Sequence, residues 1–120
     1  MKPNTRAAIA YISGSLISGI DSSAVYDKEQ QRYIQISGTI NQRNVSVYDH
    51  EQSCQITGKC NAGILKLHHY GDHHGISIKI FGNNFVGHDN GSAHDFSGKV
   101  NGNSISIYDD TIEKQFDFSI

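Results

Sequence analysis

Charge is scarce in this sequence, and the little that is present is nearly balanced. Only 18% of the 120 residues are charged, and the formal net charge is −2 at pH 7. Domains that bind nucleic acid usually carry a basic cluster, and segments that bind anionic lipids carry several neighbouring lysines or arginines. Lys and Arg are scattered singly along this chain, so we expect neither a nucleic-acid partner nor a membrane partner.

Long apolar segments are also lacking. No run approaches the ~20 apolar residues that a membrane-spanning helix needs. The first apolar stretch, "AAIAYISGSLISG", is interrupted by serine and glycine, and it follows residues 1–6, which we expect to form a flexible tail. A signal peptide has a continuous apolar centre. The sequence therefore favours a cytoplasmic location, with secretion as the alternative.

Cysteine is limited to Cys54 and Cys60, which lie six residues apart. In a single strand this spacing separates them by ~20 Å, at ~3.3 Å per residue. A disulfide requires Cα atoms only about 4.4–6.8 Å apart. We therefore expect two free thiols on one face of a strand, which fits a reducing compartment.

What the sequence does contain is a recurring alternation of apolar and polar residues. "ISGTINQRNVSVYD" (36–49) and "FSGKVNGNSISIYD" (96–109) align without a gap, and "ITGKCNAGILKLHH" (56–69) fits the same pattern. Such alternation is typical of half-buried strands, and the Asn/Gly-rich segments inside each unit are typical of tight hairpin turns. Helical periodicity is absent. We predict one β domain over residues 7–120, built from two-stranded repeats at 12–35, 36–55, 56–79, 80–95 and 96–120.

These repeats predict an all-β fold of about ten short antiparallel strands in meander order. Each strand pair has one apolar face to bury, and no helix is expected to cover it. A glycine recurs on the inward face, where it allows a strand to bend or leaves room for a large facing side chain. These glycines are Gly14, Gly38, Gly58, Gly82 and Gly98. We predict a closed or nearly closed barrel, with a β-sandwich as the alternative; the tight turns argue against a parallel β-solenoid.

The segment "LHHYGDHHG" (67–75) places four of the seven histidines within nine residues. Across a hairpin, His69 and His73 would approach each other, and Asp72 would add an oxygen ligand for Zn²⁺ or another divalent metal ion. Neighbouring residues of a strand point to opposite faces, so all four histidines cannot converge. The favoured interpretation is a solvated hairpin tip, and weak metal binding is the alternative. No other cofactor is indicated.

Alignment of the repeats places Asp27, Asp49, His69 and Asp109 at equivalent positions. In a meander barrel these side chains would lie at one rim, where grouped carboxylates raise one another's pKa or bind a hard cation. The favoured interpretation is structural, because aspartate at the end of a strand accepts hydrogen bonds from the backbone of the following turn.

Tyr26, Tyr48 and Tyr108 each precede one of these rim residues, and they should point outward. Exposed tyrosines beside polar residues are common on surfaces that bind proteins or glycans. They also serve simply as cross-strand partners within a sheet. The three tyrosines are thus a candidate binding surface.

Two His–Asp dipeptides, at 88–89 and 94–95, flank an Asn-Gly turn. Such a couple can act in acid–base catalysis, but no serine lies in a nucleophile elbow such as G-x-S-x-G. We predict that the protein is not an enzyme and contains no catalytic residue. The expected function is a small binding module for a protein or glycan partner; the alternatives are a carrier with an interior apolar cavity and a metal-binding protein.

Self-association depends on whether the sheet closes. An open sheet would expose the strands expected at residues 7–17 and 112–120, and free strand edges invite pairing between copies. A homo-oligomer formed through these edges is therefore a further possibility.

Overall fold

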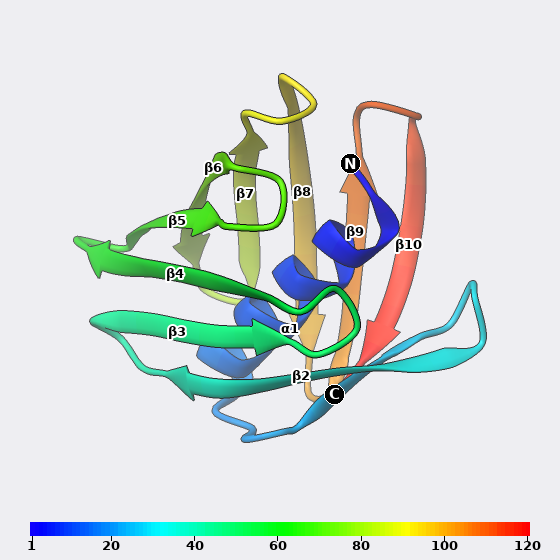
Figure 1. The fold of residues 1–120 in the computed structure, drawn as a ribbon, viewed down its shortest axis with the longest axis horizontal. Coiled ribbons are helices and arrows are strands. Elements are labelled where there is room, and N and C mark those ends of the chain that lie inside the picture. The colour runs from blue at the N-terminus through cyan, green and yellow to red at the C-terminus, as the bar shows by residue number, and fades with distance from the viewer.

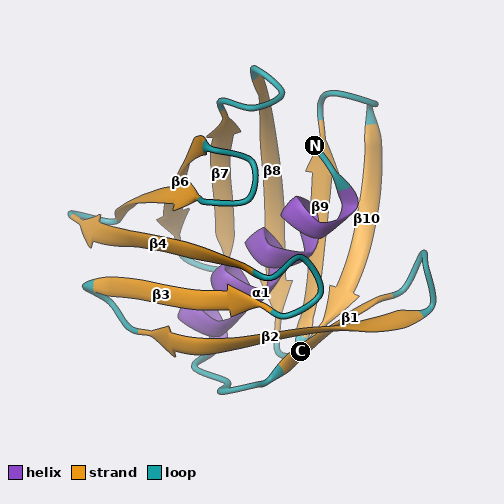
Figure 2. Ribbon diagram, in the orientation of Figure 1, coloured by secondary structure: helices purple, strands orange, loops and turns teal.

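The computed structural model describes residues 1–120 and shows a closed antiparallel barrel wrapped around one helix (Figure 1). Ten strands follow one another in meander order, and each pairs with its neighbours in the sequence. The prediction of a closed antiparallel meander of ten strands is confirmed, and the sandwich alternative is excluded. The helix runs through the interior, enclosed by the strands (Figure 2).

The elements have the following bounds: α1 (Pro3–Ser18), β1 (Ala24–Asp27), β2 (Arg32–Ile40), β3 (Asn44–Asp49), β4 (Cys54–Asn61), β5 (Ile64–His69), β6 (His74–Phe81), β7 (Asn84–Asp89), β8 (His94–Asn101), β9 (Ser104–Asp109) and β10 (Lys114–Ser119). The barrel closes where β1 pairs with β10, through Tyr26 with Ser119 and Asp27 with Phe118. The closed ring leaves no whole strand edge exposed, and only these two residue pairs form the ladder between β1 and β10.

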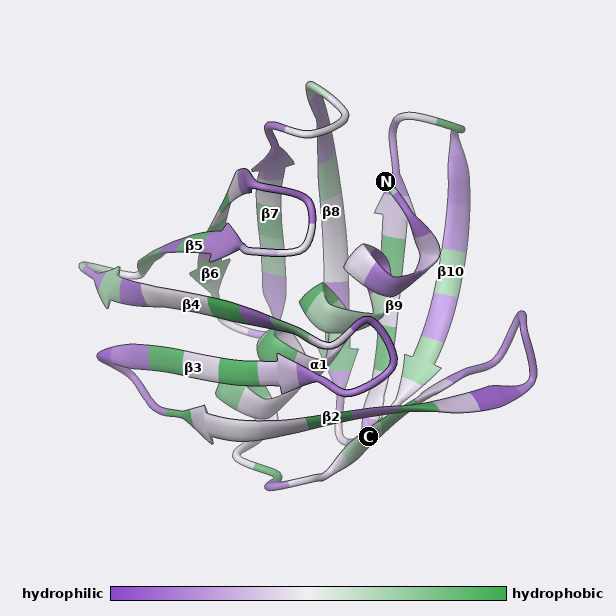
Figure 3. Ribbon diagram, in the orientation of Figure 1, coloured by the Kyte–Doolittle hydropathy of each residue, from purple (hydrophilic) through white to green (hydrophobic).

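The amino-terminal segment differs from the prediction. Residues 3–18, expected as a flexible tail followed by a strand, form α1, and Asn4, Thr5 and Arg6 are buried. The repeat expected at 12–35 therefore begins inside a helix. A helix that is apolar on all sides lacks the one-sided periodicity of a surface helix. The sequence of α1 therefore contains no amphipathic pattern that would predict a helix. Figure 3 shows hydrophobic colour on the middle turns of α1, inside the barrel.

Local sequence explains where α1 begins and ends. Pro3 lies in the first turn, where a missing N–H costs nothing. Gly19 ends the helix in the left-handed conformation, at φ 75°, and its N–H donates to the Ser15 carbonyl at 2.9 Å. Gly14 belongs to this helix, not to a strand, and a Cβ there would lie 2.9 Å from the Ile105 side chain. The small residue lets α1 approach β9.

The inward glycines of the strands bring neighbouring backbones close together. Gly38, Gly58 and Gly98 pair with Val47, Leu67 and Ile107 respectively. Gly82, in contrast, lies in the turn between β6 and β7. The expected repeat at 80–95 is therefore misplaced, since its start lies inside β6. In that hairpin the glycine lies on the second strand, where Gly87 pairs with Ile78.

Large rings occupy the space that the glycines leave. A Cβ on Gly98 would lie 2.1 Å from the Phe85 ring, and one on Gly87 would lie 2.3 Å from the Phe96 ring. One of the two predicted roles of the inward glycine, room for a large facing residue, is thus present, and the glycines also let neighbouring strands approach closely.

Replacing Gly58 with alanine is expected to lower the free energy of unfolding by about 1–3 kcal/mol, the range for overpacking. The new Cβ would lie 2.0 Å from the Lys66 carbonyl oxygen, so β4 and β5 would have to separate. Urea unfolding followed by circular dichroism measures the change. Gly82→Ala is a useful comparison, since a Cβ there meets no atom within 4 Å and only the positive φ of 61° opposes it. An effect at Gly58 no larger than at Gly82 would contradict the packing argument.

Candidate functional site

One rim of the barrel, here called the acidic rim, is built from five structurally equivalent residues. They are Asp27, Asp49, His69, Asp89 and Asp109, the last residues of β1, β3, β5, β7 and β9. All five are buried. Each accepts a hydrogen bond from a backbone N–H in the turn that follows, as Asp49 does from Glu51 at 2.9 Å. The favoured structural interpretation of these residues agrees with these hydrogen bonds.

Four of these five residues were predicted from the sequence to lie at this rim, and Asp89 was not. The misplaced repeat at 80–95 hid it, although a constant spacing of 20 residues links Asp49, His69, Asp89 and Asp109. The structure shows the same equivalence in the turns. The fourth residue after each rim residue has a positive φ, so all five turns share one conformation. Those residues are Gln31, Ser53, His73, Ala93 and Glu113.

The acidic rim also holds the first turn of α1. Arg6 Nη1 donates to Asp109 Oδ2 at 3.2 Å, and both side chains are buried. Asn4 Nδ2 donates to Asp49 Oδ2 at 3.4 Å. The Arg6 guanidinium stacks on the Phe116 ring, with its central carbon 3.7 Å from the ring centroid. These contacts tie the helix to three different strands of the barrel.

Electrostatics favours this placement of the helix. The amino-terminal end of a helix carries a partial positive charge, which nearby carboxylates stabilise. Burial by itself would raise the pKa of Asp109, but hydrogen bonds from the Thr111 backbone and hydroxyl and from the Met1 amino group outweigh burial and lower it. Burial likewise opposes the lowered pKa of Asp72, which follows from hydrogen bonds with Lys2 and Thr5. Both carboxyls are therefore held as carboxylates.

The three candidate metal ligands do not form a metal site. His69 is buried, whereas His73 is exposed in the turn, and the register pairs His69 with His74. The Asp72 carboxylate bonds to Lys2 at 2.7 Å and Thr5 at 3.1 Å. No group of three or more His, Cys, Asp or Glu side chains is arranged to hold a metal ion. His69 Nδ1 accepts the Asp72 backbone N–H, which assigns the ring proton to Nε2, an atom without a hydrogen-bond partner.

The two cysteines lie near opposite ends of β4 as free thiols. Cys54 is buried beside the acidic rim, and burial, aided by the negative charge of Asp49, raises the pKa of its thiol. A thiol with a raised pKa is a weak nucleophile at neutral pH, so this position favours a packing role.

Aromatic rings form a row on the outer wall just below the acidic rim. The row contains Tyr26, Tyr48, His68, His88 and Tyr108, each one residue before a rim residue. On β1 and β2 the Tyr26 and Tyr33 rings meet edge to face, with centroids 4.8 Å apart. On β3 the Tyr48 ring lies 4.9 Å from the His50 ring. Tyr108 lies on β9, separated from β1 by the single strand β10, so Tyr26 stands between Tyr48 and Tyr108 in the row, and no ring contact joins the three predicted tyrosines to one another.

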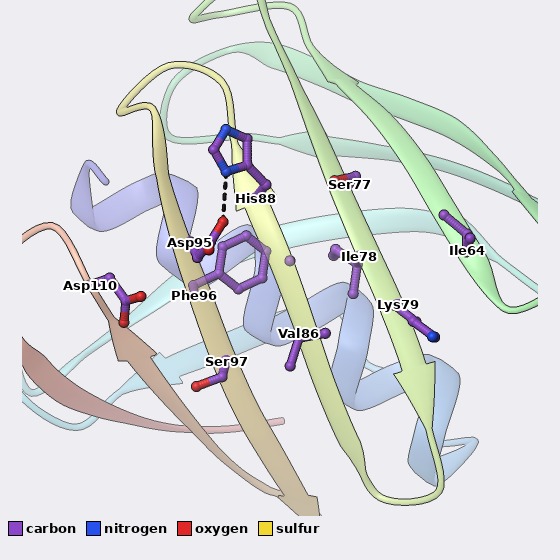
Figure 4. A pocket seen from close by; sticks show the side chains of 11 residues that line it. Ile64, Ser77, Ile78, Lys79, Val86, His88, Asp95, Phe96, Ser97 and Asp110 are labelled. Atoms are coloured by element: carbon purple, nitrogen blue, oxygen red, sulfur yellow. Dashed lines mark hydrogen bonds and ion pairs between the residues drawn. The ribbon is translucent and has the colours of Figure 1, made fainter.

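A shallow hollow of about 470 Å³ lies on the outer wall over β6, β7 and β8 (Figure 4). In it His88 Nδ1 lies 2.7 Å from Asp95 Oδ1. The histidine thus pairs across the β7–β8 hairpin, not with its sequence neighbour Asp89, which points inward. Figure 4 shows the His88 ring turned towards Asp95 on β8. Ser77, the cross-strand partner of His88 on β6, makes no hydrogen bond to the His88 ring.

The comparisons with known proteins add no relative, because no family model, curated protein or solved structure matches this chain. The helix α1 lacks the length and hydrophobicity that a transmembrane helix requires.

Proposed function

We propose that this chain is a non-catalytic binding module that recognises a protein or glycan partner through the outer wall of its barrel. The fold supports an outward site, because α1 fills the interior with buried side chains that pack against the inner faces of the strands. A carrier of apolar ligands would need that interior space for its ligand.

The observation that carries the proposal is the exposed aromatic surface of β1–β3. The Tyr33 side chain is 73% exposed and stands against Tyr26. An exposed tyrosine offers a ligand a flat apolar ring face and, at its hydroxyl, a polar edge. Around them lie groups that form hydrogen bonds, among which Ser37 Oγ lies 2.8 Å from His50 Nε2.

This surface is better suited to a glycan than to a protein partner with a flat interface. Sugars present apolar C–H faces that stack on aromatic rings, and their hydroxyls need the donors and acceptors of neighbouring polar side chains. The outward side chains of β2 beside Tyr33 include Gln35, Ser37 and Thr39, which supply such donors and acceptors. A polar wall with few charges is suited to an uncharged, hydroxyl-rich partner.

Replacing Tyr33 with serine is expected to weaken binding of the full chain to its preferred glycan at least tenfold, about 1.4 kcal/mol. The reason is the loss of a stacking face. The preferred glycan is first identified on a glycan array, and affinity is then measured by titration calorimetry. The matched control is Tyr108→Ser, which removes an exposed tyrosine on β9, three strands away from Tyr33 on β2, and should leave the affinity unchanged.

Two results would overturn the glycan proposal. One is an array on which the folded wild-type chain binds nothing; capture of a protein partner that is lost in Tyr33→Ser would then place a protein interface there. The other is equal weakening by the two tyrosine variants, which would show that the β1–β3 surface is not the binding site.

A further inference from the structure

The strand register gathers cations that are far apart in the sequence. Lys59 on β4 and Lys66 on β5 are direct cross-strand partners. Lys79 follows on β6 and Lys99 on β8, and Arg43 lies in the turn before β3, where its carbonyl accepts the Cys60 N–H. These five exposed residues, here called the basic face, lie on the outer wall towards the rim opposite the acidic one. The scattered lysines of the sequence thus form one surface.

None of these five cations takes part in a salt bridge. The outer faces of β3–β7 carry no carboxylate, because Asp49 and Asp89 point inward. On β8 the exposed Asp95 lies near the acidic rim and pairs with His88 at 2.7 Å, while Asp21 and Asp117 belong to the β1 and β10 side of the barrel. Like charges placed directly opposite each other, as Lys59 and Lys66 are, destabilise a sheet. A negatively charged partner would relieve this repulsion.

Exposed apolar side chains are interleaved with the lysines. Lys79 has Ile64 as its cross-strand partner on one side and Val86 on the other. Phe81 is the next outward residue after Lys79 on β6. Ile64, Phe81 and Val86 are 42%, 48% and 39% exposed, so the basic face is also one of the apolar parts of the surface.

We propose that the basic face docks on an anionic phospholipid surface, with Phe81, Ile64 and Val86 entering the interface between headgroups and acyl chains. Lysines flanking exposed apolar side chains match the layered chemistry of such a surface, where anionic headgroups lie above hydrocarbon. A soluble polyanion such as a sulfated glycan or nucleic acid would satisfy the lysines but would leave the three apolar side chains in water. The interaction is peripheral and leaves the aromatic surface of β1–β3 free.

The test is co-sedimentation of the full chain with vesicles of phosphatidylcholine containing about one third phosphatidylserine, against vesicles of phosphatidylcholine alone. Each lysine near an anionic surface contributes about 1 kcal/mol, or about fivefold in partitioning. The double variant Lys59→Gln/Lys66→Gln should therefore bind about 25-fold more weakly than wild type. Phe81→Ser should weaken binding by about tenfold through lost apolar burial, and this loss should persist at high salt.

Matched controls use the opposite end of the barrel. Lys28→Gln/Lys114→Gln removes two exposed lysines at the acidic rim and has the same net charge as the test variant, while Ile112→Ser removes an exposed isoleucine there. Both should bind vesicles as wild type does. Thermal unfolding confirms that every variant is folded.

Three outcomes would overturn the proposal. They are failure of wild type to bind the anionic vesicles, equal loss in the test and control lysine variants, and lysine-dependent binding to heparin or duplex DNA without binding to vesicles. Because the two surfaces are separate, these outcomes leave the Tyr33 result unaffected, and the two proposals fail independently.

Discussion

Replacing Ile9 with alanine is expected to lower the free energy of unfolding by about 2–5 kcal/mol, the range for large-to-small changes in a packed core. Ile9 is 1% exposed and lies in the helix that fills the barrel. Its removal leaves a void that ten hydrogen-bonded strands cannot close, because the circumference of the ring is fixed by their number. Urea unfolding monitored by circular dichroism and tyrosine fluorescence measures the loss.

Ile112→Ala is the matched control for this substitution. Ile112 is 54% exposed in the turn between β9 and β10, so its truncation should change stability by less than about 0.5 kcal/mol. Similar losses of unfolding free energy in the two variants would mean that packing of α1 against the strands does not stabilise the barrel.

Replacing Asp109 with asparagine is expected to cost about 3 kcal/mol of stability, at the lower end for breaking a buried ion pair. The asparagine oxygen can still accept the Thr111 N–H, so the turn remains capped. What is lost is the charge opposite Arg6, whose side chain is only 9% exposed and has few other partners. The neighbouring substitution Asp110→Asn, at an exposed residue, should have little effect.

The Asp109 carboxylate also contributes to the response to acid, through its hydrogen bonds with Thr111 and the Met1 amino group. The folded-state pKa of Asp109 is lowered, and so is that of Asp72. Stability from these carboxylates is therefore fully present above the unfolded-state pKa of about 3.9 and is lost as pH falls below it towards the folded-state values. Wild type should melt at progressively lower temperature from pH 5 to pH 3, and Asp109→Asn should show a shallower decline. Parallel declines in the two proteins would show that Asp109 is not ionised in the folded state.

The strands of this fold could be predicted because each half-buried strand shows its own alternation of apolar and polar residues, whatever its neighbours are. Alternation in 36–49, 56–69 and 96–109 gives the hairpins, and the inward glycines indicate curvature. The helix could not be predicted in the same way. Residues 7–14 are enclosed on all sides, so polarity does not alternate at any period, and Gly14 matched the glycine of the strand repeat.

The candidate sites were predictable only as far as they depend on strand order. Equivalent positions along the repeat placed Asp27, Asp49, His69 and Asp109 at one rim, and the structure brings them there. Contacts between distant segments had no local signal. Arg6 with Asp109, and Lys59 beside Lys66, depend on the route of the helix and on strand register. The positions of charges along the sequence therefore gave no sign of the basic face, which forms only when several strands lie side by side.

The narrow junction between β1 and β10 has a consequence for how the protein is made. During synthesis on the ribosome, the apolar helix emerges first and the last wall of its enclosure emerges last. The barrel cannot shut until residues near 24–27 meet residues near 118–119, and contacts so distant along the chain slow folding. Until then the apolar side chains of α1 have no complete wall to pack against.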